Sequence, residues 1–229
     1  MMVKSAHVMV VTPHPDDAEY GVAGTVVRWV REGKDVVYVV VTNGDKGTSD
    51  NRIAPQELAR IREEEQLASA HLLGVREVQF LRYPDQGLED TPLFRKEIVR
   101  WIRAYRPNTV VTADPYRRYI WHRDHRVTGR VTLDAIFPFA RDHLSYPELL
   151  REGLTPHKVR EVLLWASEEE DVNFRSDISE TFTIKLSALR CHHSQVGHLP
   201  LRELEARLKQ RSEERRVGKE CRSRWSPYH

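Results

Sequence analysis

Cysteine is scarce in this sequence. Its 229 residues include two cysteines, Cys191 and Cys221, too few for the disulfide framework of a small secreted protein. Long apolar runs are also lacking, since the stretch 36–41 is far shorter than the roughly 20 residues that a membrane-spanning helix needs. The first residues show no signal-peptide pattern, because Lys4 and His7 interrupt them. These absences predict a cytoplasmic protein without a membrane span.

Glycine-rich nucleotide-binding patterns are absent as well. Gly44 and Gly47 lie in a polar stretch, but neither the GxxxxGK[ST] nor the GxGxxG spacing occurs in the sequence. The turn after the first expected strand carries His-Pro-Asp-Asp at the place where a dinucleotide-binding domain has its glycines. A nucleotide-binding α/β domain is therefore disfavoured.

The end of the chain differs sharply in composition from the rest. Residues 211–229 read RSEERRVGKECRSRWSPYH, without apolar periodicity, and this string resembles the translation of a common sequencing adapter. We predict that the natural sequence is cut near Gln210, so that its own C-terminus is missing. The segment 211–229 is then a non-native tail that makes no regular tertiary contacts. The alternative is a genuine basic tail that binds an anionic partner.

The charge balance depends on this tail. The whole chain has 36 Lys and Arg residues and 34 Asp and Glu residues, which gives a net charge of +2. Without residues 211–229, 30 basic and 31 acidic residues remain, and the net charge becomes −1. A balance so close to zero gives no electrostatic reason to expect a nucleic-acid partner.

Short apolar runs alternate with stretches of helical periodicity before residue 211. Strands are expected at 7–12, 35–42, 77–83, 109–113 and 159–166, and helices at 17–33, 55–73, 92–105, 127–139 and 180–195. This alternation is typical of parallel βαβ units. We therefore predict one α/β domain over residues 1–210, with a three-layer Rossmann-like fold around a mostly parallel, twisted sheet.

In such folds, ligands bind beyond the carboxyl ends of the strands. Polar stretches follow four of the expected strands, at 14–17, 43–51, 84–88 and 114–125. Because these strand ends share one edge of a parallel sheet, we expect the polar residues to form one site there.

The strongest local signal is the motif TPHPDD at residues 12–17, directly after the first expected strand. His14 and Asp17 are three residues apart across a tight turn, so both side chains can approach one cation. Asp16 would lie near that cation without binding it. The alternative is a proline-rich turn in which an aspartate merely caps the following helix.

A second signal is the motif WHRDH at residues 121–125, which follows the fourth expected strand. Two histidines at this spacing also occur in ordinary polar loops. Catalytic zinc takes three nitrogen or oxygen ligands from the protein and keeps an open position for water. His14, Asp17 and His125 supply such a set.

The two motifs together resemble the PIG-L/LmbE-like family of zinc-dependent N-deacetylases. The hallmarks of that family are (P/A)HPDD after the first strand and HxDH later in the chain. The similarity covers roughly residues 7–197. It extends to the pattern Arg62-x-x-Glu65, to Leu73-Gly74, to the Pro84-Asp85 turn and to the stretch 187–195.

The resemblance implies a metal site and a catalytic apparatus. His14, Asp17 and His125 would bind zinc, although iron(II) can occupy the same kind of ligand set. Asp16 would be the general base that deprotonates the metal-activated water. His122 would polarise the scissile carbonyl, stabilise the oxyanion and protonate the leaving amine.

The remaining implied roles concern orientation and the substrate. Asp124 would orient or charge His122, and Arg62 and Asp85 correspond to family positions that contact the sugar or its attached group. Without the resemblance, Arg62 would belong to a solvated helix face and Asp85 would be an ordinary turn residue. The sequence departs from the family at Arg123, which replaces the usual proline and could reach the mouth of the site.

The implied activity is hydrolysis of the N-acetyl group of an N-acetylglucosamine-like unit in a small-molecule conjugate. Zinc lowers the pKa of bound water to about 7, which provides the strong nucleophile that an amide requires. One alternative is an amidase that cleaves a larger acyl conjugate at the same metal site. Another is a metal- or sugar-binding module without turnover, but such a module would be expected to lose Asp16 or His122. A homo-oligomer is compatible with the sequence.

Overall fold

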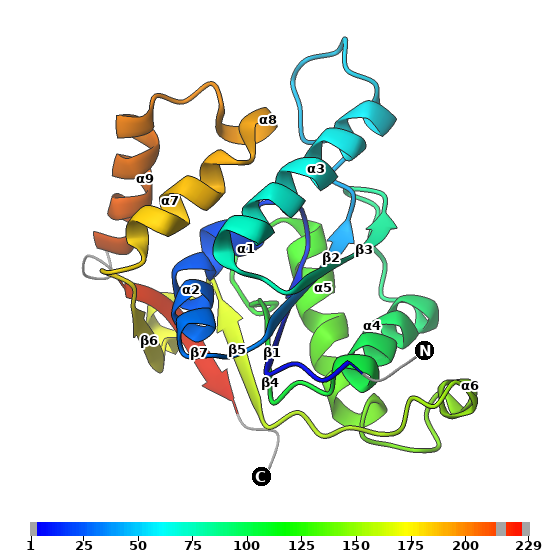
Figure 1. Ribbon diagram of the computed structural model, residues 1–229. Coiled ribbons are helices and arrows are strands. Elements are labelled where there is room, and N and C mark those ends of the chain that lie inside the picture. Colours follow the sequence, from blue (N-terminus) through cyan, green and yellow to red (C-terminus); the bar gives the residue numbers. More distant parts are fainter. Residues whose placement is uncertain (1–3, 214–218, 226–229) are drawn as a thin grey trace.

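A seven-stranded sheet with helices on both faces forms the centre of the molecule (Figure 1). The computed structural model describes residues 4–213 and 219–225, with side chains up to residue 209. The strand order is β3-β2-β1-β4-β5-β7-β6. The strands are β1 (Val8–Thr12), β2 (Val36–Thr42), β3 (Glu77–Tyr83), β4 (Thr109–Ala113), β5 (Glu161–Trp165), β6 (Phe174–Asp177) and β7 (Lys219–Trp225).

The first five strands pair in parallel and are joined by helices. The helices are α1 (Asp17–Gly21), α2 (Ala23–Arg31), α3 (Pro55–Leu73), α4 (Pro92–Tyr105), α5 (Arg123–Asp134), α6 (Pro147–Arg151), α7 (Phe182–Arg190), α8 (His193–Val196) and α9 (Leu201–Glu213). A π-turn, η1 (Ala135–Phe139), continues α5, and a 3₁₀ turn, η2 (Glu169–Asp171), follows β5. The α/β class and the mostly parallel sheet that we expected are confirmed.

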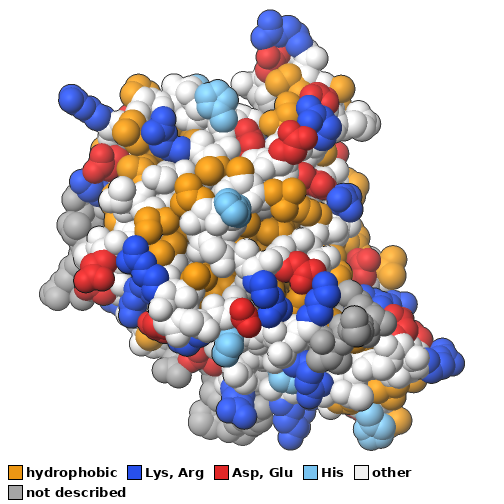
Figure 2. Space-filling model, in the orientation of Figure 1, with side chains coloured by type: hydrophobic (Ala, Val, Ile, Leu, Met, Phe, Trp, Pro, Cys, Tyr) orange, Lys and Arg blue, Asp and Glu red, His pale blue; other side chains and the backbone are white. Residues whose placement is uncertain are grey.

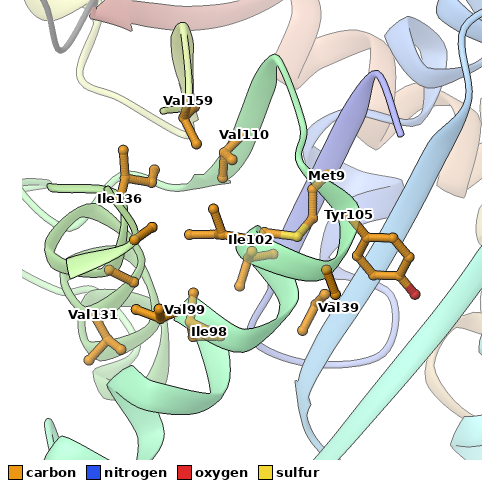
Figure 3. Packing of buried hydrophobic residues seen from close by; sticks show 14 of the residues in the cluster. Met9, Val39, Ile98, Val99, Ile102, Tyr105, Val110, Val131, Ile136 and Val159 are labelled. Atoms are coloured by element: carbon orange, nitrogen blue, oxygen red, sulfur yellow. The ribbon is translucent and has the colours of Figure 1, made fainter. Parts of the chain in front are cut away.

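Alternating side chains of the central strands feed two separate apolar layers. In β1, Met9 and Val11 face the layer under α4 and α5, whereas Val8 and Val10 face the layer under α2 and α7. Figure 3 shows the first layer, where Met9 lies near Ile102 of α4. Both faces are covered, so every residue of β1 and β2 is buried. Burial of one valine or methionine side chain in these layers stabilises the folded state by about 1.5–3 kcal/mol.

The first helix is interrupted, contrary to the prediction of one helix over 17–33. Val22 has φ −143°, which ends α1 and separates it from α2. A side chain at Gly21 would overlap with Trp165 of β5, and one at Gly24 would overlap with Ile178. The chain therefore approaches its neighbours more closely at these glycines than a regular amphipathic pattern suggests.

Helix α5 begins earlier than the helix predicted at 127–139. It starts at Arg123 and not at residue 127, because the ring of His122 accepts a hydrogen bond from the Asp124 amide and so caps the helix. The structure also contains α6, β6 and α9, which were not expected. Leu204 and Leu208 of α9 pack against Leu186 and Leu189 of α7 in a small third cluster.

The prediction that the tail makes no regular contacts is wrong for part of it. The backbone of β7 pairs antiparallel with both β5 and β6. A physical reason is that an unpaired strand edge presents a row of amide and carbonyl groups, which accept almost any extended segment. The non-native origin of the tail stays a prediction, and residues 214–218 and 226–229 lie outside the described residues.

Two surface properties agree with the sequence. Within the part of the chain that the structure describes, no helix has the length and apolar character needed to cross a membrane. On the face shown in Figure 2, basic and acidic side chains are interspersed, and neither sign forms a continuous field.

The strand order changes direction at β1, near the centre of the sheet. β1 has β2 on one side and β4 on the other, so the chain segments that leave these strands diverge. Ligands of open α/β sheets bind at such a point, beyond the carboxyl ends of the strands. The segments that follow β1, β2, β3 and β4 all contribute to the site described next.

Candidate functional site

The turn after β1 carries the histidine and the two adjacent aspartates. His14 is almost fully buried, and its backbone amide donates a hydrogen bond to Asp17 Oδ2 over 3.0 Å. Asp16 precedes α1 with φ 101°, in the left-handed region that non-glycine residues rarely adopt. Such a conformation costs about 1–3 kcal/mol and persists only where its surroundings hold it.

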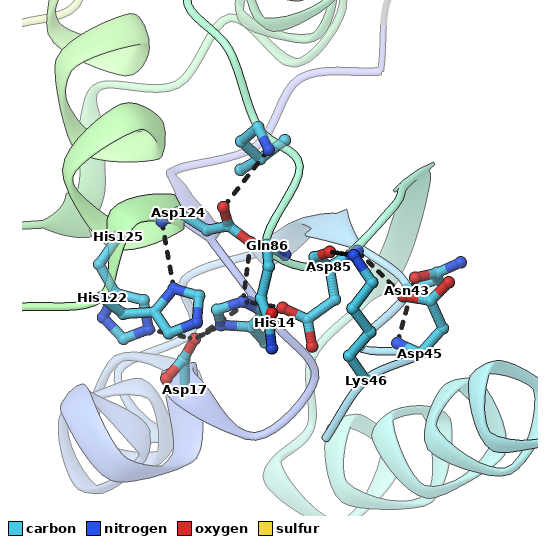
Figure 4. Close-up of polar contacts among 12 residues, drawn as sticks. His14, Asp17, Asn43, Asp45, Lys46, Asp85, Gln86, His122, Asp124 and His125 are labelled. Atoms are coloured by element: carbon cyan, nitrogen blue, oxygen red, sulfur yellow. Dashed lines mark hydrogen bonds and ion pairs between the residues drawn. The ribbon is translucent and has the colours of Figure 1, made fainter. Parts of the chain in front are cut away.

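Asp17 brings the turn and α5 together (Figure 4). Its Oδ2 lies 2.8 Å from His14 Nδ1 and 3.0 Å from His125 Nε2. His125 is 8% exposed, and its Nδ1 has no hydrogen-bond partner among the described residues. Two imidazoles and one carboxylate therefore converge from two elements, and this donor set fits a catalytic zinc ion.

Charges in this group strongly perturb one another. Burial would raise the pKa of Asp17, but the neighbouring His125 and His14 outweigh it and hold that pKa well below its usual range. Burial likewise would lower the pKa of His14, yet its hydrogen bonds to Asp124 and Asp17 raise it well above 6.5. Such mutual stabilisation is what a buried cluster of opposite charges produces.

Other side chains near His14 could also hold a cation. Ligand atoms of His14, His122 and His125 lie within 4.8 Å of one another, and so do those of His14, Asp85, His122 and Asp124. We favour Asp17 as the carboxylate ligand because its Oδ2 contacts both histidines. His14 Nε2 faces Asp85 and Asp124 instead, and carboxylates in this position fix the orientation of a metal-binding imidazole.

Asp16 lies beside the arginine of α3, and its side chain is 13% exposed. Its Oδ2 lies 3.3 Å from Arg62 Nη2. Burial raises the pKa of Asp16 to about 6, although Arg62 opposes this shift. The carboxylate thus has a higher proton affinity than that of an exposed aspartate.

Arg62 is 3% exposed and does not lie on a solvated helix face. Its Nη1 donates to the carbonyl of Gly44 over 3.0 Å, and its Nη2 donates to the carbonyl of Pro15 over 2.5 Å. Gly44 and Gly47 leave room for this guanidinium, because a side chain at either position would overlap with it. Its Nε has no hydrogen-bond partner among the described residues, so its expected contact with a sugar stays a prediction.

Asp85 lies in the turn after β3, close to His14. Its Oδ1 is 3.1 Å from His14 Nε2. The loop after β2 fixes its backbone, since Asp45 Oδ1 accepts from the Asp85 amide and Lys46 Nζ donates to the Asp85 carbonyl. From the sequence, Asp45 and Lys46 could either line the site or belong to a plain loop, because a polar, glycine-flanked stretch at a strand end is compatible with both.

His122 is the most exposed histidine of the cluster. Its Nδ1 accepts a hydrogen bond from the Asp124 amide over 3.1 Å. In the neutral ring the hydrogen therefore resides on Nε2, which becomes a donor. Burial lowers the pKa of His122, and the nearby His14 lowers it further.

Asp124 is fully buried, and its carboxylate contacts groups other than His122. Oδ2 accepts from the Gln86 amide over 2.7 Å and lies 3.2 Å from His14 Nε2, while the Leu88 amide approaches Oδ1 at 3.4 Å. Asp124 contacts His122 through its backbone amide, which donates to His122 Nδ1 at the start of α5. The expected role of Asp124 in orienting or charging His122 stays a prediction, for which this backbone contact is the available structural support.

Arg123 points to a surface partner. Its Nη2 lies 2.6 Å from Glu89 Oε1, and both side chains are more than half exposed. The other eight residues singled out in the sequence lie together at the carboxyl edge of the sheet, although they come from four separate segments of the chain.

Comparison with known proteins bears directly on this arrangement. Residues 9–136 match the model of the PIG-L family, described as GlcNAc-PI de-N-acetylase. The chain belongs to the PIG-L family. Its sequence is 37% identical over 188 residues to the diacetylchitobiose deacetylase of Thermococcus kodakarensis, which corresponds to 82% of this chain and 69% of that relative. It is also 31% identical over 169 residues to the mycothiol S-conjugate amidase of Streptomyces coelicolor, covering 64% and 57% of the two chains.

The fold leads to the same family. The N,N′-diacetylchitobiose deacetylase of Pyrococcus horikoshii, solved with an inhibitor, superimposes with a TM-score of 0.90 at 30% identity, over 98% of this chain and 88% of that one. This PIG-L protein is accordingly a deacetylase, a hydrolase of amide bonds, with a histidine and aspartate cluster suited to a metal.

Proposed function

We propose that this PIG-L protein is a zinc-dependent deacetylase that acts on an N-acetylglucosamine-type unit of a small-molecule conjugate. The observation that carries the proposal is the approach of Asp17 Oδ2 to both His14 Nδ1 and His125 Nε2, with Asp16 next to them in the chain. His14, Asp17 and His125 would hold the metal. When bound, zinc would act as a Lewis acid and lower the pKa of a bound water to about 7.

Asp16 is the residue we assign as general base. It lies in the turn between His14 and Asp17, its backbone is left-handed, and its carboxylate contacts Arg62. A carboxylate in this position can accept a proton from the attacking water. We assign the return of this proton to the leaving nitrogen to Asp16 and not to His122, because the single ring hydrogen of neutral His122 is used at the carbonyl oxygen. Proton transfer by a positioned group typically contributes about 10²- to 10⁴-fold to a rate.

His122 is the residue we assign to the oxygen of the scissile amide. The cap contact with the Asp124 amide leaves the Nε2 hydrogen of the neutral ring free to donate. The developing oxyanion would accept this hydrogen bond, and losing such a donor typically costs about 10²- to 10³-fold in rate. Its exposure places it where a substrate can reach it.

Asp85 and Arg62 are assigned to the sugar. Asp85 carries a buried carboxylate next to His14, and Arg62 retains an unpaired Nε. A carboxylate and a guanidinium can together accept from and donate to neighbouring sugar hydroxyls. The relative from Thermococcus kodakarensis, named for a disaccharide of N-acetylglucosamine, supports a substrate of this kind.

A second candidate is an amidase that removes a larger acyl group. It is favoured by the similarity to a mycothiol S-conjugate amidase. The same metal site and the same base would serve both reactions, since each breaks an amide bond at a sugar nitrogen. The two readings differ in the acid that is released.

The test measures amine and acetate release from N-acetylglucosamine and N,N′-diacetylchitobiose by zinc-loaded protein. Asp16→Asn should lower kcat by about 10²- to 10⁴-fold and keep its zinc, because asparagine tolerates the left-handed backbone but is not a base. Asp17→Asn should lose zinc as well as activity. Asp35→Asn makes the same chemical change at the amino end of β2, and it should keep both.

The proposal fails if Asp16→Asn retains the wild-type kcat, or if Asp17→Asn binds zinc as tightly as the wild type. A wild-type protein that binds zinc but releases no acetate, and instead cleaves a longer acyl conjugate, would establish the amidase reading.

A further inference from the structure

The peptide bond between Pro15 and Asp16 is held on both sides by one helix. On one side, Arg62 Nη2 donates to the Pro15 carbonyl over 2.5 Å. On the other, the Asp16 amide donates to Gln66 Oε1 over 3.1 Å. Arg62 and Gln66 lie one turn apart on α3, so their side chains leave the same face of the helix.

Gln66 is itself fixed by a buried carboxylate. It is fully buried, and its Nε2 donates to Glu19 Oε1 over 2.9 Å. Ser69 Oγ donates to the same oxygen over 2.8 Å. These contacts determine which way round the Gln66 amide lies, because Glu19 can only accept, and the Gln66 oxygen is therefore directed at the Asp16 amide.

Glu19 needs a compensating charge because it is 0% exposed. His192, equally buried, faces it from the turn between α7 and α8, with Nε2 3.4 Å from Glu19 Oε2. Burial would lower the pKa of His192, but Glu19 outweighs it and raises that pKa, which favours the charged ring. An isolated carboxylate in such a position would be strongly unfavourable. Glu19 and His192 thus form the base of a polar chain that runs through Gln66 to Asp16.

This polar chain ends at Asp16, the residue with a strained backbone in the motif at 12–17. Asp16 has φ 101°, and a residue keeps such a conformation only where several contacts impose it. Rotation of the 15–16 peptide would break the bonds to Arg62 and to Gln66 together. A change in φ at Asp16 would also alter the direction of its side chain relative to this peptide, because φ sets the angle between the two.

We propose that Gln66, held in place by Glu19 and His192, is a positioning residue that fixes the direction of the Asp16 carboxylate. The proposal rests on the function proposed above, in which Asp16 is the base. Gln66 contacts no reacting group. It acts through the backbone of Asp16, and its loss should slow the chemical step while leaving the sugar contacts intact.

The test compares Gln66→Met with Ser69→Ala. Methionine matches glutamine in size but removes both hydrogen bonds, whereas Ser69→Ala removes one bond to the same Glu19 oxygen and leaves the Asp16 amide paired. In Gln66→Met we expect kcat for diacetylchitobiose to fall about 10- to 100-fold, as for a misplaced catalytic group. KM should stay within about threefold of the wild-type value, because Asp85 is untouched and Arg62 keeps its bond to the Gly44 carbonyl.

Zinc content and structure complete the test. We expect Gln66→Met to keep full zinc, and its crystal structure to show the 15–16 peptide rotated, while Ser69→Ala keeps wild-type kcat and backbone. Equal kcat in the two variants, loss of zinc in proportion to loss of activity, or an unchanged peptide in Gln66→Met would each overturn the proposal.

Two further readouts keep this result separate from the proposed function. A wild-type protein inactive on acetylated sugars would contradict the deacetylase, yet the crystal structure would still decide whether Gln66 fixes the peptide. If Gln66→Met does not fold, Gln66→Ala removes the same bonds without adding bulk, and it is judged by the same outcomes.

Discussion

At the scale of single residues, α3 shows what a sequence pattern reveals and what it hides. Leu58, Arg62, Gln66, Ser69 and Leu73 form one buried stripe at helical spacing. The stretch 60–65 is so rich in charge that Arg62 looked like one more solvated residue. The available signal was the stripe itself, because polar residues in line with two buried leucines must find partners inside the molecule.

The residues of the two motifs could be identified from sequence, but their contacts could not. His14, Asp17 and His125 come together as the spacing and the strand ends predicted. Asp124 was expected beside His122, yet its carboxylate binds the turn after β3. The spacing of residues in the sequence does not predict this contact, because the position of the turn depends on where β3 lies in the sheet.

Arg123 provides a prediction at this scale. It is the first residue of α5, where proline is favourable, and His122 has φ −57° and ψ 134°, which a following proline permits. Arg123→Pro should therefore raise the free energy of unfolding by about 0.4–1 kcal/mol, because the proline ring reduces the conformational entropy of the unfolded chain. The lost surface ion pair with Glu89 offsets at most about 1 kcal/mol. Urea denaturation measures the change.

Arg123→Ala is the matched control, because it removes the same ion pair without the proline ring. We expect Arg123→Pro to be the more stable of the two variants. A proline variant less stable than the alanine variant would show that the start of α5 is not free to accept the ring.

At the scale of elements, the site depends on how deeply α5 sits against β4. A side chain at Gly129 would overlap with the carbonyl of Ala113 and crowd Pro115. The helix can approach the strand because this position has no side chain, and the approach sets the depth of His125, one turn earlier. The sequence pattern predicted a helix here, but it did not reveal how close the helix would lie.

Gly129→Ala is therefore expected to push α5 outward. The overlap is with backbone, which cannot rotate away, so we expect a loss of about 1–3 kcal/mol in the free energy of unfolding. Displacement of His125 should also weaken zinc binding, which competition with a chelator can measure. The exposed neighbour Arg130 gives the control: if Arg130→Ala weakens zinc binding as much as Gly129→Ala does, helix depth is not the cause.

At the scale of the whole molecule, the sheet was the most predictable feature. Buried β-branched runs separated by helices identify parallel strands, and parallel strands place their ends on one edge. Short elements were less predictable. β6 has a polar sequence, FRSD, and exists through pairing with β7, so nothing in its own residues indicates a strand.

The stability of the whole fold depends on pH, and His157 contributes to its loss in acid. Its Nε2 lies 2.7 Å from the Pro107 carbonyl. Burial lowers the pKa of His157 below 6.5, and the nearby Arg106 and Arg160 lower it further. The unfolded chain then binds a proton at a higher pH than the folded protein does. Stability from this residue is complete above about pH 7.5 and declines on acidification toward the folded pKa.

We expect His157→Gln, which keeps a donor for the Pro107 carbonyl, to lose less stability than the wild type between about pH 7.5 and about pH 5.5. Urea denaturation at the two pH values gives the comparison, and His71→Gln on the exposed side of α3 serves as the control. Parallel declines in wild type and His157→Gln would contradict the role of His157.

The contacts of α8 have a consequence for synthesis on the ribosome. Gln195 donates to the Gly47 carbonyl across 148 residues, and Ser194 binds Glu65 across 129. All the expected metal ligands have been synthesised by residue 125, long before these partners emerge. A growing chain consequently exposes its histidines and carboxylates to cellular ions before the last supports of the site exist, and the site reaches its final shape late in translation.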